Sequence, residues 1–450
     1  MKMSLKLKGN TRVWTPPRIL ALGYAIIILL GTTLLMLPES HQSGVGMSFL
    51  NAFFTATSAT CVTGLVVVDT GTFFTTFGQT VIMCLIQIGG LGFMTMATLI
   101  ALVFRRRISL RERLILQESM NQGDMEGIVR LIKKVLYYSF AIELAGAIVF
   151  SLRLMMDHPP GQAVFFGIFH AVSLFNNAGF DLFGGYRSLT GYVDDPIMNL
   201  VAILLIVLGG LGFVVLSDLI EFRKNRRLSL HTKSVLLMTG ILLTAGFVLV
   251  FLFEFTNPGT LGKLSWGGKF WASLFHSTTT RTAGANTIDL TQLRQATLML
   301  TIIFMFIGGS PGSTAGGVKT TTILLMFGAV LAMLRGRKDV VLFRFRLGQE
   351  RIFKALTIVI FALVLVITAT MILSMTESTD FLTVLFEATS AFGTVGLSLG
   401  LTPHLTVVGK LLICLLMFAG RVGLITLAYA LAPKQEKEPF RYAEGKIMIG

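Results

Sequence analysis

The sequence predicts an all-α polytopic membrane protein in which four copies of one unit are arranged pseudo-tetramerically around a common axis. Two observations support this prediction. Of the 450 residues, 53% are hydrophobic and 14% are charged, whereas about a quarter of the residues in an ordinary soluble domain are charged. A short motif that ends in glycine also recurs four times between long apolar runs. The composition excludes a soluble enzyme and a disordered chain, because neither could present so apolar a surface to water.

The net charge of +15 comes from basic residues that gather at the N-terminus and in three clusters between apolar runs. Positive charge concentrates on the cytoplasmic side of membrane proteins, so we expect these regions to face the cytoplasm. Nucleic-acid binding explains the charge less well, because no stacking aromatic residues interleave with the basic ones. The clusters are Arg105, Arg106, Arg107, Arg111 and Arg113; Arg223, Lys224, Arg226, Arg227 and Lys233; and Arg335, Arg337, Lys338, Arg344, Arg346, Arg351 and Lys354.

Eight apolar runs are long enough to cross a bilayer, which requires about 20 residues. The first run lacks a small-residue cleavage site, so we expect a retained helix rather than a signal peptide. An even number of spans places both termini in the cytoplasm. The runs comprise residues 19–37, 80–104, 132–153, 197–222, 235–253, 295–334 (interrupted), 355–373 and 407–431.

Between the two spans of each pair lies a segment too short to cross, and the four segments resemble one another. Each ends in glycine and has a hydroxyl residue six positions earlier; three of the four have phenylalanine ten positions earlier. The glycines are 115, 105 and 112 residues apart, and such a period indicates an array of similar units. The segments read FTATSATCVTG (54–64), FHAVSLFNNAG (169–179), LFHSTTTRTAG (274–284) and FEATSAFGTVG (386–396), with hydroxyls at Ser58, Ser173, Thr278 and Ser390.

The second span of each pair carries a glycine motif of its own. The motifs read GGLGF (89–93), GGLGF (209–213), GGSPG (308–312) and AGRVG (419–423). Two features that recur together in four units make chance agreement improbable. They divide the chain into four repeats, which comprise residues 1–110, 111–228, 229–345 and 346–450, the last with a C-terminal cytoplasmic tail.

The glycine loops are the candidate ion filter. Irregular backbone at membrane depth is tolerated only where it is buried in protein or lines a watery path. Loop carbonyls can replace the water shell of an ion such as potassium, and the C-terminal end of each short helix favours a cation. Turn glycines in membrane hairpins are the alternative, but four aligned loops favour a potassium-channel-like pore. The candidate filter residues are Thr60, Cys61, Val62, Thr63, Gly64, Asn176, Asn177, Ala178, Gly179, Arg281, Thr282, Ala283, Gly284, Gly393, Thr394, Val395 and Gly396, with potassium at the four glycines Gly64, Gly179, Gly284 and Gly396.

The four loops, including Thr394-Val395-Gly396, and the interrupted third-unit helix resemble the Trk/Ktr/HKT superfamily of potassium transporters, in particular the membrane subunit of bacterial Ktr systems. The resemblance covers nearly the whole chain. It implies potassium uptake across the bacterial cytoplasmic membrane by a homodimer that sits on a cytoplasmic ring of RCK-type (KtrA-type) subunits. The sequence contains no such soluble domain, so the resemblance implies a separate regulatory chain that binds ATP, ADP or NAD, and no cofactor in this chain.

The residues at and after the loop glycines refine this expectation. In the superfamily a serine at the first-loop glycine accompanies sodium permeation, so glycine in all four loops favours potassium. The next residue is bulky in three units, where it is Leu65, Phe180 or Leu397, but it is Ala285 in the third. We therefore expect the packing behind the third loop to differ.

A stretch of glycines, small hydroxyl residues and one proline interrupts the second span of the third unit, and these residues cannot hold a regular helix without outside support. A phosphate-binding loop needs G-x-x-x-x-G-K-[ST] after a strand, whereas Val318 separates Gly317 from Lys319 here. A passive hinge is an alternative. The resemblance implies an intramembrane gate below the filter, which we favour. Its candidate residues are Gly308, Gly309, Ser310, Pro311, Gly312, Ser313, Thr314, Ala315, Gly316, Gly317 and Lys319, together with Arg421 of the last span.

Arg421 lies well inside the last span, at the position of Leu91 and Leu211 in other units. A charged residue at membrane depth is costly and normally faces the interior or a cavity. One interpretation is an ion pair with a carboxylate such as Glu143 or Asp218. The other, which we favour, is an electrostatic barrier on the pore axis, close to the gate.

Other polar residues near the loops have structural interpretations. We expect the polar residues of the short helices to support the loops through hydrogen bonds, the arginine of the third loop to point away from the path, and the lysine of the gate to snorkel toward the cytoplasm. The carboxylates that follow two of the loops are surface groups or attract cations at the outer mouth. These residues are His170, His276 and Glu387; Arg281; Lys319; and Asp69 and Asp181.

A membrane enzyme would need convergent nucleophile, base or metal-ligand residues, and the sequence contains no such cluster. Cys61, Cys84 and Cys414 are too few and too scattered for a disulfide framework, a zinc site or a redox pair. A secondary transporter with inverted halves is less favoured, because the repeats are parallel. Potassium uptake coupled to sodium or protons stays open. The expected partners are a second copy of the chain, the regulatory ring and membrane lipid, without nucleic acid.

Overall fold

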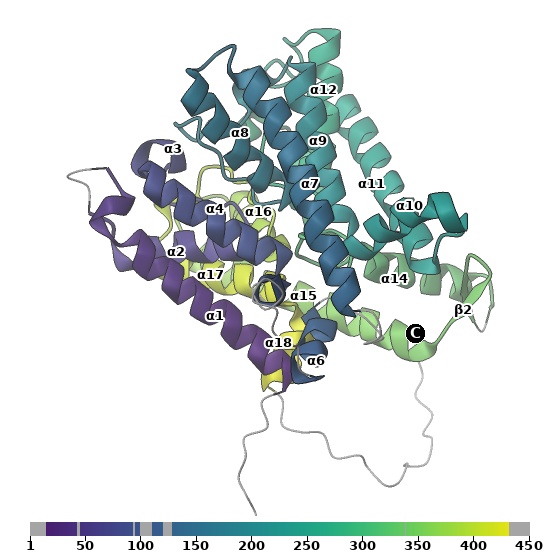
Figure 1. Ribbon diagram of the computed structural model, residues 1–450. Helices are drawn as coiled ribbons and strands as arrows, with labels where there is room; N and C mark the ends of the chain where they lie inside the picture. The colour runs from purple at the N-terminus through teal and green to yellow at the C-terminus, as the bar shows by residue number, and fades with distance from the viewer. Residues whose placement is uncertain are drawn as a thin grey trace, which may run out of the picture.

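The computed structural model describes residues 15–42, 46–92, 95–99, 110–119, 128–337 and 339–431. These residues are mostly helical, and the helices follow one another through the molecule unit by unit, from the purple first unit to the yellow-green fourth unit (Figure 1). The basic residues 105–107 and the predicted tail from residue 432 onward lie outside the described residues.

Each unit begins with a long apolar helix. These helices are α1 (Pro16–Leu35), α7 (Ile128–Leu154), α11 (Leu230–Glu254) and α15 (Gln349–Thr376). At about 1.5 Å per residue, each is long enough to cross a hydrocarbon core of about 30 Å. Among the described residues, these four are the single helices whose length and hydropathy suit a membrane span. Four of the eight predicted spans are therefore present as continuous helices.

A shorter helix follows in each unit, and its C-terminal half is buried. We call them the pore helices after their predicted role; they are α2 (Phe49–Thr60), α8 (Pro160–Phe175), α12 (Trp266–Thr279) and α16 (Phe381–Gly393). They have 12 to 16 residues, and at about 1.5 Å per residue none reaches across the membrane. Each carries a phenylalanine without exposed surface at a similar position, which packs in the core: Phe54, Phe169, Phe275 and Phe386.

The second long helix of each unit stops part-way. These helices are α4 (Thr76–Leu91), α9 (Pro196–Leu211), α13 (Gln295–Phe306) and α17 (Val407–Val422). The prediction of four second spans, of which only the third is interrupted, is wrong in this respect.

Glycine backbones cause the other three breaks. Gly92, Gly212 and Gly423 follow α4, α9 and α17 at φ of 84°, 97° and 90°, a region that ends a right-handed helix and suits glycine. After Gly212 the chain resumes as α10 (Phe213–Asn225), bent by 101° from α9. In the third unit residues 307–319, which separate α13 from α14 and contain most of the predicted gate loop (308–320), take the place of the single glycine.

Shorter elements join these helices within and between the units. The helical ones are α3 (Thr70–Phe73), α6 (Leu110–Ser119), α14 (Thr320–Leu334), α18 (Leu424–Leu431) and the 3₁₀ turns η1 (Pro38–Ser40), η2 (Thr190–Tyr192), η3 (Leu290–Gln292) and η4 (Thr402–His404). Strands β1 (Val340–Leu342) and β2 (Phe345–Leu347) form an antiparallel hairpin between α14 and α15, with Val340 paired to Leu347.

The glycines of the second helices let them touch the ends of the pore helices. A Cβ atom built on Gly89 would lie 2.0 Å from the carbonyl oxygen of Thr60, the last residue of α2. Gly209 and Gly420 make the same approach to the last turns of α8 and α16, at 1.8 Å and 1.9 Å. No real Cβ fits at these distances, so the GG motif is required by helix packing as well as by the bend.

The contact of Gly420 with the end of α16 corrects the predicted alignment of the fourth unit's glycine motif with that of the first unit. Gly420 occupies the place of Gly89, three residues before the breaking glycine in both units. Arg421 therefore corresponds to Gly90, and its expected alignment with Leu91 is wrong by one residue. The fourth unit therefore has an arginine at the position where the first unit has a glycine without a side chain.

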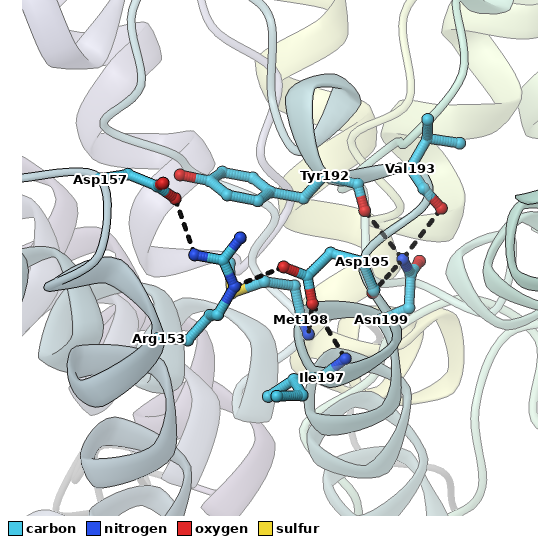
Figure 2. A network of polar contacts seen from close by, with 8 residues as sticks. All are labelled: Arg153, Asp157, Tyr192, Val193, Asp195, Ile197, Met198 and Asn199. Carbon is cyan, nitrogen blue, oxygen red and sulfur yellow. Dashed lines mark hydrogen bonds and ion pairs between the residues drawn. The ribbon is translucent and has the colours of Figure 1, made fainter.

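In every unit the C-terminal side of the first helix is tied to the N-terminal end of the second helix, by different chemistry. In the second unit Arg153 of α7 donates to Asp195, the N-cap of α9, at 2.5 Å and to Asp157 at 2.8 Å (Figure 2). Asp195 also accepts from the backbone N–H groups of Ile197 and Met198. Because Asp195 serves both contacts, it fixes the start of α9 against the end of α7.

Carboxylates take over this task in the third and fourth units. Glu254 at the end of α11 accepts from the backbone N–H of Arg294, the N-cap of α13, at 3.0 Å. Glu377 after α15 accepts from the hydroxyl of Thr406, the N-cap of α17, at 2.6 Å. In the first unit the hydroxyl of Thr75 donates to the backbone carbonyl of Glu39. These contacts fix where each second helix begins relative to the end of the first helix of its unit.

The contact at Gly420 gives a test of the packing. Gly420→Ala is expected to lower the melting temperature in detergent, because its Cβ would lie 1.9 Å from the carbonyl of Phe392. Gly240→Ala on α11 is the matched control, since nothing lies within 4 Å of its added Cβ and alanine favours a helix by about 1 kcal/mol over glycine. If both variants melt like the unmodified chain, the close helix contact is wrong.

Candidate ion pathway

The four loop glycines form a closed ring. A Cβ atom built on Gly64 would lie 3.3 Å from the Cα of Gly179, one on Gly179 would lie 2.8 Å from Gly284, and one on Gly284 would lie 3.2 Å from Gly396. The ring closes because a Cβ on Gly396 would lie 3.0 Å from the Cα of Gly64. Loops separated by more than 100 residues in sequence therefore meet backbone to backbone, in chain order.

Each loop has an unusual backbone that the sequence did not reveal. The glycines have φ between 68° and 93°, and the residue two positions earlier also has positive φ. Three of those residues are β-branched, for which the left-handed region is a genuine outlier. Such strain persists only where the surroundings impose it, and it recurs in all four units. The residues and their angles are Val62 (58°), Asn177 (59°), Thr282 (75°) and Thr394 (49°).

Hydroxyl groups at the ends of the pore helices hold the loops. In the first and fourth units Ser58 and Ser390 accept from the backbone N–H of the loop glycine, each at 3.1 Å. In the second unit Ser173 instead donates to the carbonyl of Phe180, one residue after the glycine, at 2.7 Å. Either bond fixes the loop relative to its own pore helix.

The third loop is one residue shorter than the others. Thr279 donates to the carbonyl of Ala285, as Ser173 does in the second unit, whereas Thr278 bonds within its own helix to Leu274. Thr279 is therefore the hydroxyl that anchors the third loop, although Thr278 is the residue at the repeated six-residue spacing. With this shift Phe275 takes the place first given to Leu274.

The residues three positions before the loop glycines differ in type and in surroundings. Asn176 donates to Glu143 and Gln87. The guanidinium of Arg281 reaches Thr239 of α11 at 3.3 Å. Cys61 is buried, and Gly393 lies against the carbonyl of Met305 on α13. The side chains of Asn176 and Arg281 thus act as loop supports.

Four of the predicted filter residues keep a buried hydroxyl without a hydrogen-bond partner among the described residues. Buried polar groups without a protein partner are uncommon. They lie within the four-residue stretches that precede three of the loop glycines, so they add polar groups to the surroundings of the ring. They are Thr60, Thr63, Thr282 and Thr394.

The interrupting segment of the third unit is an ordered loop. Ile307 and Val318 form a parallel bridge, and the backbone N–H of Gly308 donates to the carbonyl of Val318 at 2.9 Å. Thr320, where α14 begins, donates to the carbonyl of Gly309 at 3.1 Å. The two ends of the segment therefore lie side by side, and the residues between them form a loop.

The middle of this loop contacts the second unit. Backbone N–H groups of Ser310 and Thr314 donate to the carbonyls of Gly210 and Gly209, at 3.1 Å and 3.3 Å. These carbonyls lie at the end of α9, where no further helical turn satisfies them. The N–H of Phe213 donates to Gly312 at 2.9 Å. The segment thus caps a broken helix of another unit.

The same segment also lies against two filter loops. The hydroxyl of Thr314 is 3.3 Å from the carbonyl of Phe175 at the end of α8. A Cβ built on Gly316 would lie 2.1 Å from the hydroxyl of Thr394. The segment is therefore packed directly against the second and fourth loops.

Arg421 bonds only carbonyl groups in the described part of the chain. It donates to Gly89, to Gly90 at 2.8 Å and to Thr314 of the interrupting segment. Neither carboxylate of the proposed ion pair reaches it: Glu143 bonds Gln87 and Asn176, and Asp218 bonds Ser229 and Thr232. The ion-pair interpretation is therefore wrong.

Lys319 folds back into the segment rather than toward the cytoplasm. Its Nζ donates to the carbonyl of Ala315 at 2.6 Å, so the expectation that it snorkels outward is wrong. Lys319 and Arg421 both line a cavity of about 250 Å³ beside the segment, with Tyr24, Thr95 and Lys354 on its other walls. A cation in this cavity would face the basic side chains of Lys319, Lys354 and Arg421.

The polar residues of the pore helices have partners inside the protein. His170 lies 2.7 Å from the carbonyl of Phe166, and His276 lies 3.0 Å from the hydroxyl of Thr301. Glu387 accepts from Ser398 and from Thr402 in the connector beyond the fourth loop. Among the described residues no group of three His, Cys, Asp or Glu could hold a metal. These residues brace the loops and connectors.

The carboxylates beyond the first two loops lie close together. Asp69 accepts from the backbone N–H of Tyr186 at 2.8 Å, which links the connectors of the first and second units. Burial, with a smaller contribution from the neighbouring charge of Asp69, raises the pKa of Asp181 to about 7. The carboxylate of Asp181 is therefore only partly ionised at neutral pH.

The comparisons with known proteins agree with this geometry. The TrkH family, described as "Cation transport protein", matches residues 17–439. The chain belongs to the TrkH family. It is a family of transport proteins rather than of enzymes.

Relatives of known name cover the whole chain. The chain is 46% identical over 437 residues to the Ktr system potassium uptake protein B of Bacillus subtilis, with 97% of each chain covered. It is 39% identical to the potassium/sodium uptake protein NtpJ of Enterococcus hirae, with all of each chain covered. The potassium transporter TrkH of Vibrio parahaemolyticus has the same fold, with a TM-score of 0.75 over 95% of this chain and 86% of that one, at 20% identity.

Proposed function

We propose that this chain takes up potassium across the bacterial cytoplasmic membrane, through a pseudo-tetrameric filter made by its four glycine loops. The closed ring of Gly64, Gly179, Gly284 and Gly396 carries the proposal. A ring of backbone carbonyls can replace the hydration shell of a potassium ion, and the buried threonine hydroxyls add polar groups nearby. Two relatives of the chain are named as potassium uptake proteins of Ktr systems.

The interrupting segment, residues 308–320, is the proposed gate. It lies against the second and fourth loops, and Arg421 ties it to α4 of the first unit. A gate needs two arrangements of similar energy, and a segment of glycines and small residues held mainly by backbone hydrogen bonds can rearrange. The positive charges of Lys319 and Arg421 then oppose cation passage while the segment is closed.

Regulation and assembly follow from the relatives by analogy. The name "Ktr system" describes a transporter of more than one part, so the proposed partners are a cytoplasmic nucleotide-binding ring and a second copy of this chain. Both termini are placed in the cytoplasm, because the basic clusters follow the positive-inside pattern. The hairpin β1–β2 and the start of α15 carry part of one of these clusters: Arg344, Arg346, Arg351 and Lys354.

Uptake coupled to sodium is the second candidate, because one relative is named a potassium/sodium uptake protein. Rubidium uptake into liposomes that hold the purified chain separates the two candidates. Uptake without sodium on either side supports uncoupled passage, whereas an absolute requirement for sodium supports coupling.

Selectivity is expected to depend on the ring. Gly64→Ser and Gly396→Ser place a side chain 2.2 Å and 2.0 Å from loop carbonyl oxygens, at φ values that serine rarely adopts. The potassium-to-sodium flux ratio should fall or transport should be lost. Gly400→Ser is the control, since it also has positive φ but has open space around its Cβ. Wild-type ratios in both ring variants would contradict the proposed filter.

The gate is expected to limit the rate of uptake. Deleting residues 312–317 removes the contacts to Phe213, Phe175 and Thr394, so the maximal uptake rate should rise while the potassium-to-sodium preference stays. Arg421→Gln should raise the rate as well, because it removes the charge and the guanidinium bond to Thr314 of the segment. A deletion variant that folds and reaches the membrane, yet is no faster, would indicate a passive hinge.

A further inference from the structure

One carboxylate at membrane depth takes no part in the ring or the gate. Glu143 lies near the middle of α7 and exposes 5% of its surface. No basic side chain forms an ion pair with it among the described residues. A carboxylate inside a membrane protein is costly and usually marks a functional position. The contacts of Glu143 indicate what that function is.

Glu143 joins two units through a triangle of side chains. Its Oε2 accepts from Nε2 of Gln87 on α4 at 3.0 Å, and its Oε1 accepts from Nδ2 of Asn176 at 3.0 Å. Nδ2 of Asn176 also lies 2.8 Å from Oε1 of Gln87. Each corner of the triangle thus contacts both others, from helices of the first and second units.

Asn176 transmits this support to the second filter loop. It is the C-cap of α8 and stands directly before Asn177, whose φ is 59°. On its other side, the Oδ1 of Asn176 packs on Gly90, where an added Cβ would lie 2.0 Å away, and it has no hydrogen-bond partner among the described residues. The amide is therefore wedged between Glu143 and α4, so its orientation depends on the bonds of its Nδ2.

We propose that Glu143 is a positioning residue for the second filter loop, and through Asn176 a determinant of potassium selectivity. The inference rests on the proposed function and deepens it. A carboxylate offers acceptor oxygens to both amide donors at once, whereas a glutamine would present one oxygen and a competing N–H₂ group. The residues equivalent to Asn176 in the third and fourth loops contact other groups: Arg281 bonds Thr239, and Gly393 packs on the carbonyl of Met305. The contact with Glu143 therefore supports only the second loop among these.

A merely structural role would stabilise the fold without changing selectivity. Glu254 provides the matched control, because it is a buried carboxylate of α11 that ties the outer end of that helix to α13. Glu254→Ala should lower the melting temperature and leave the flux ratio unchanged. The comparison therefore separates general destabilisation from an effect on the second loop.

The test measures potassium-to-sodium flux ratios in liposomes for the full chain. Glu143→Ala should lower the ratio by about tenfold, the scale of one buried hydrogen-bonding group left unpaired, and Glu143→Gln should lower it less. Adding Asn176→Ala to Glu143→Ala should cause no further loss, because both act through one contact. If Glu143→Ala does not fold, Glu143→Gln alone decides the outcome.

A folded Glu143 variant with the wild-type ratio would overturn this role, as would additive losses in the double variant. Such a result would leave the proposed filter intact. A wild-type chain without any potassium preference would instead overturn the proposed function, and the role of Glu143 with it.

Discussion

The rest of the structure depends on one constraint: backbone groups at membrane depth must find partners within the protein. Four second helices break in the membrane, and each break leaves carbonyl groups that no further turn can satisfy. In the second unit the N–H groups of the interrupting segment reach Gly209 and Gly210. In the first unit the guanidinium of Arg421 reaches Gly89 and Gly90. The broken helix ends and the proposed gate are therefore one hydrogen-bonded assembly.

Glycine serves two separate purposes in this assembly. In the loops it reaches positive φ and lets four backbones meet, as at Gly64 and Gly396. In the second helices, at positions such as Gly209, it lets a helix touch the carbonyl end of a pore helix. The loop glycines and the helix glycines alternate along the chain, and the position of the loops depends on the packing at the helix glycines. The ring stays in place only if the helices behind it approach closely enough.

The sequence predicts much of the fold, because four imperfect copies of one pattern carry more information than any single copy. The long first helices and the glycine loops follow directly from it. The register of the third loop does not: both Thr278 and Thr279 are hydroxyl residues, and a loop shorter by one residue looks the same as a shifted motif. The true anchor emerges only from the bond between Thr279 and Ala285.

Other features of the site could not be predicted because they depend on contacts between distant segments. The partners of Arg421 are backbone carbonyls, which leave no mark in the sequence, so carboxylates such as Glu143 were the natural candidates. The positive φ of Val62 and Thr394 contradicts their local preference, and only the surrounding ring imposes it. The paired role of Glu143 and Asn176 joins residues 33 positions apart, without a motif to connect them.

The central claim is that the four loops hold a dehydrated cation on one axis. Anomalous diffraction from crystals of the protein grown in rubidium tests it most directly. The account predicts anomalous density on the axis enclosed by Gly64, Gly179, Gly284 and Gly396, which disappears when sodium replaces rubidium. Rubidium bound elsewhere, with no density within the ring, would contradict the account.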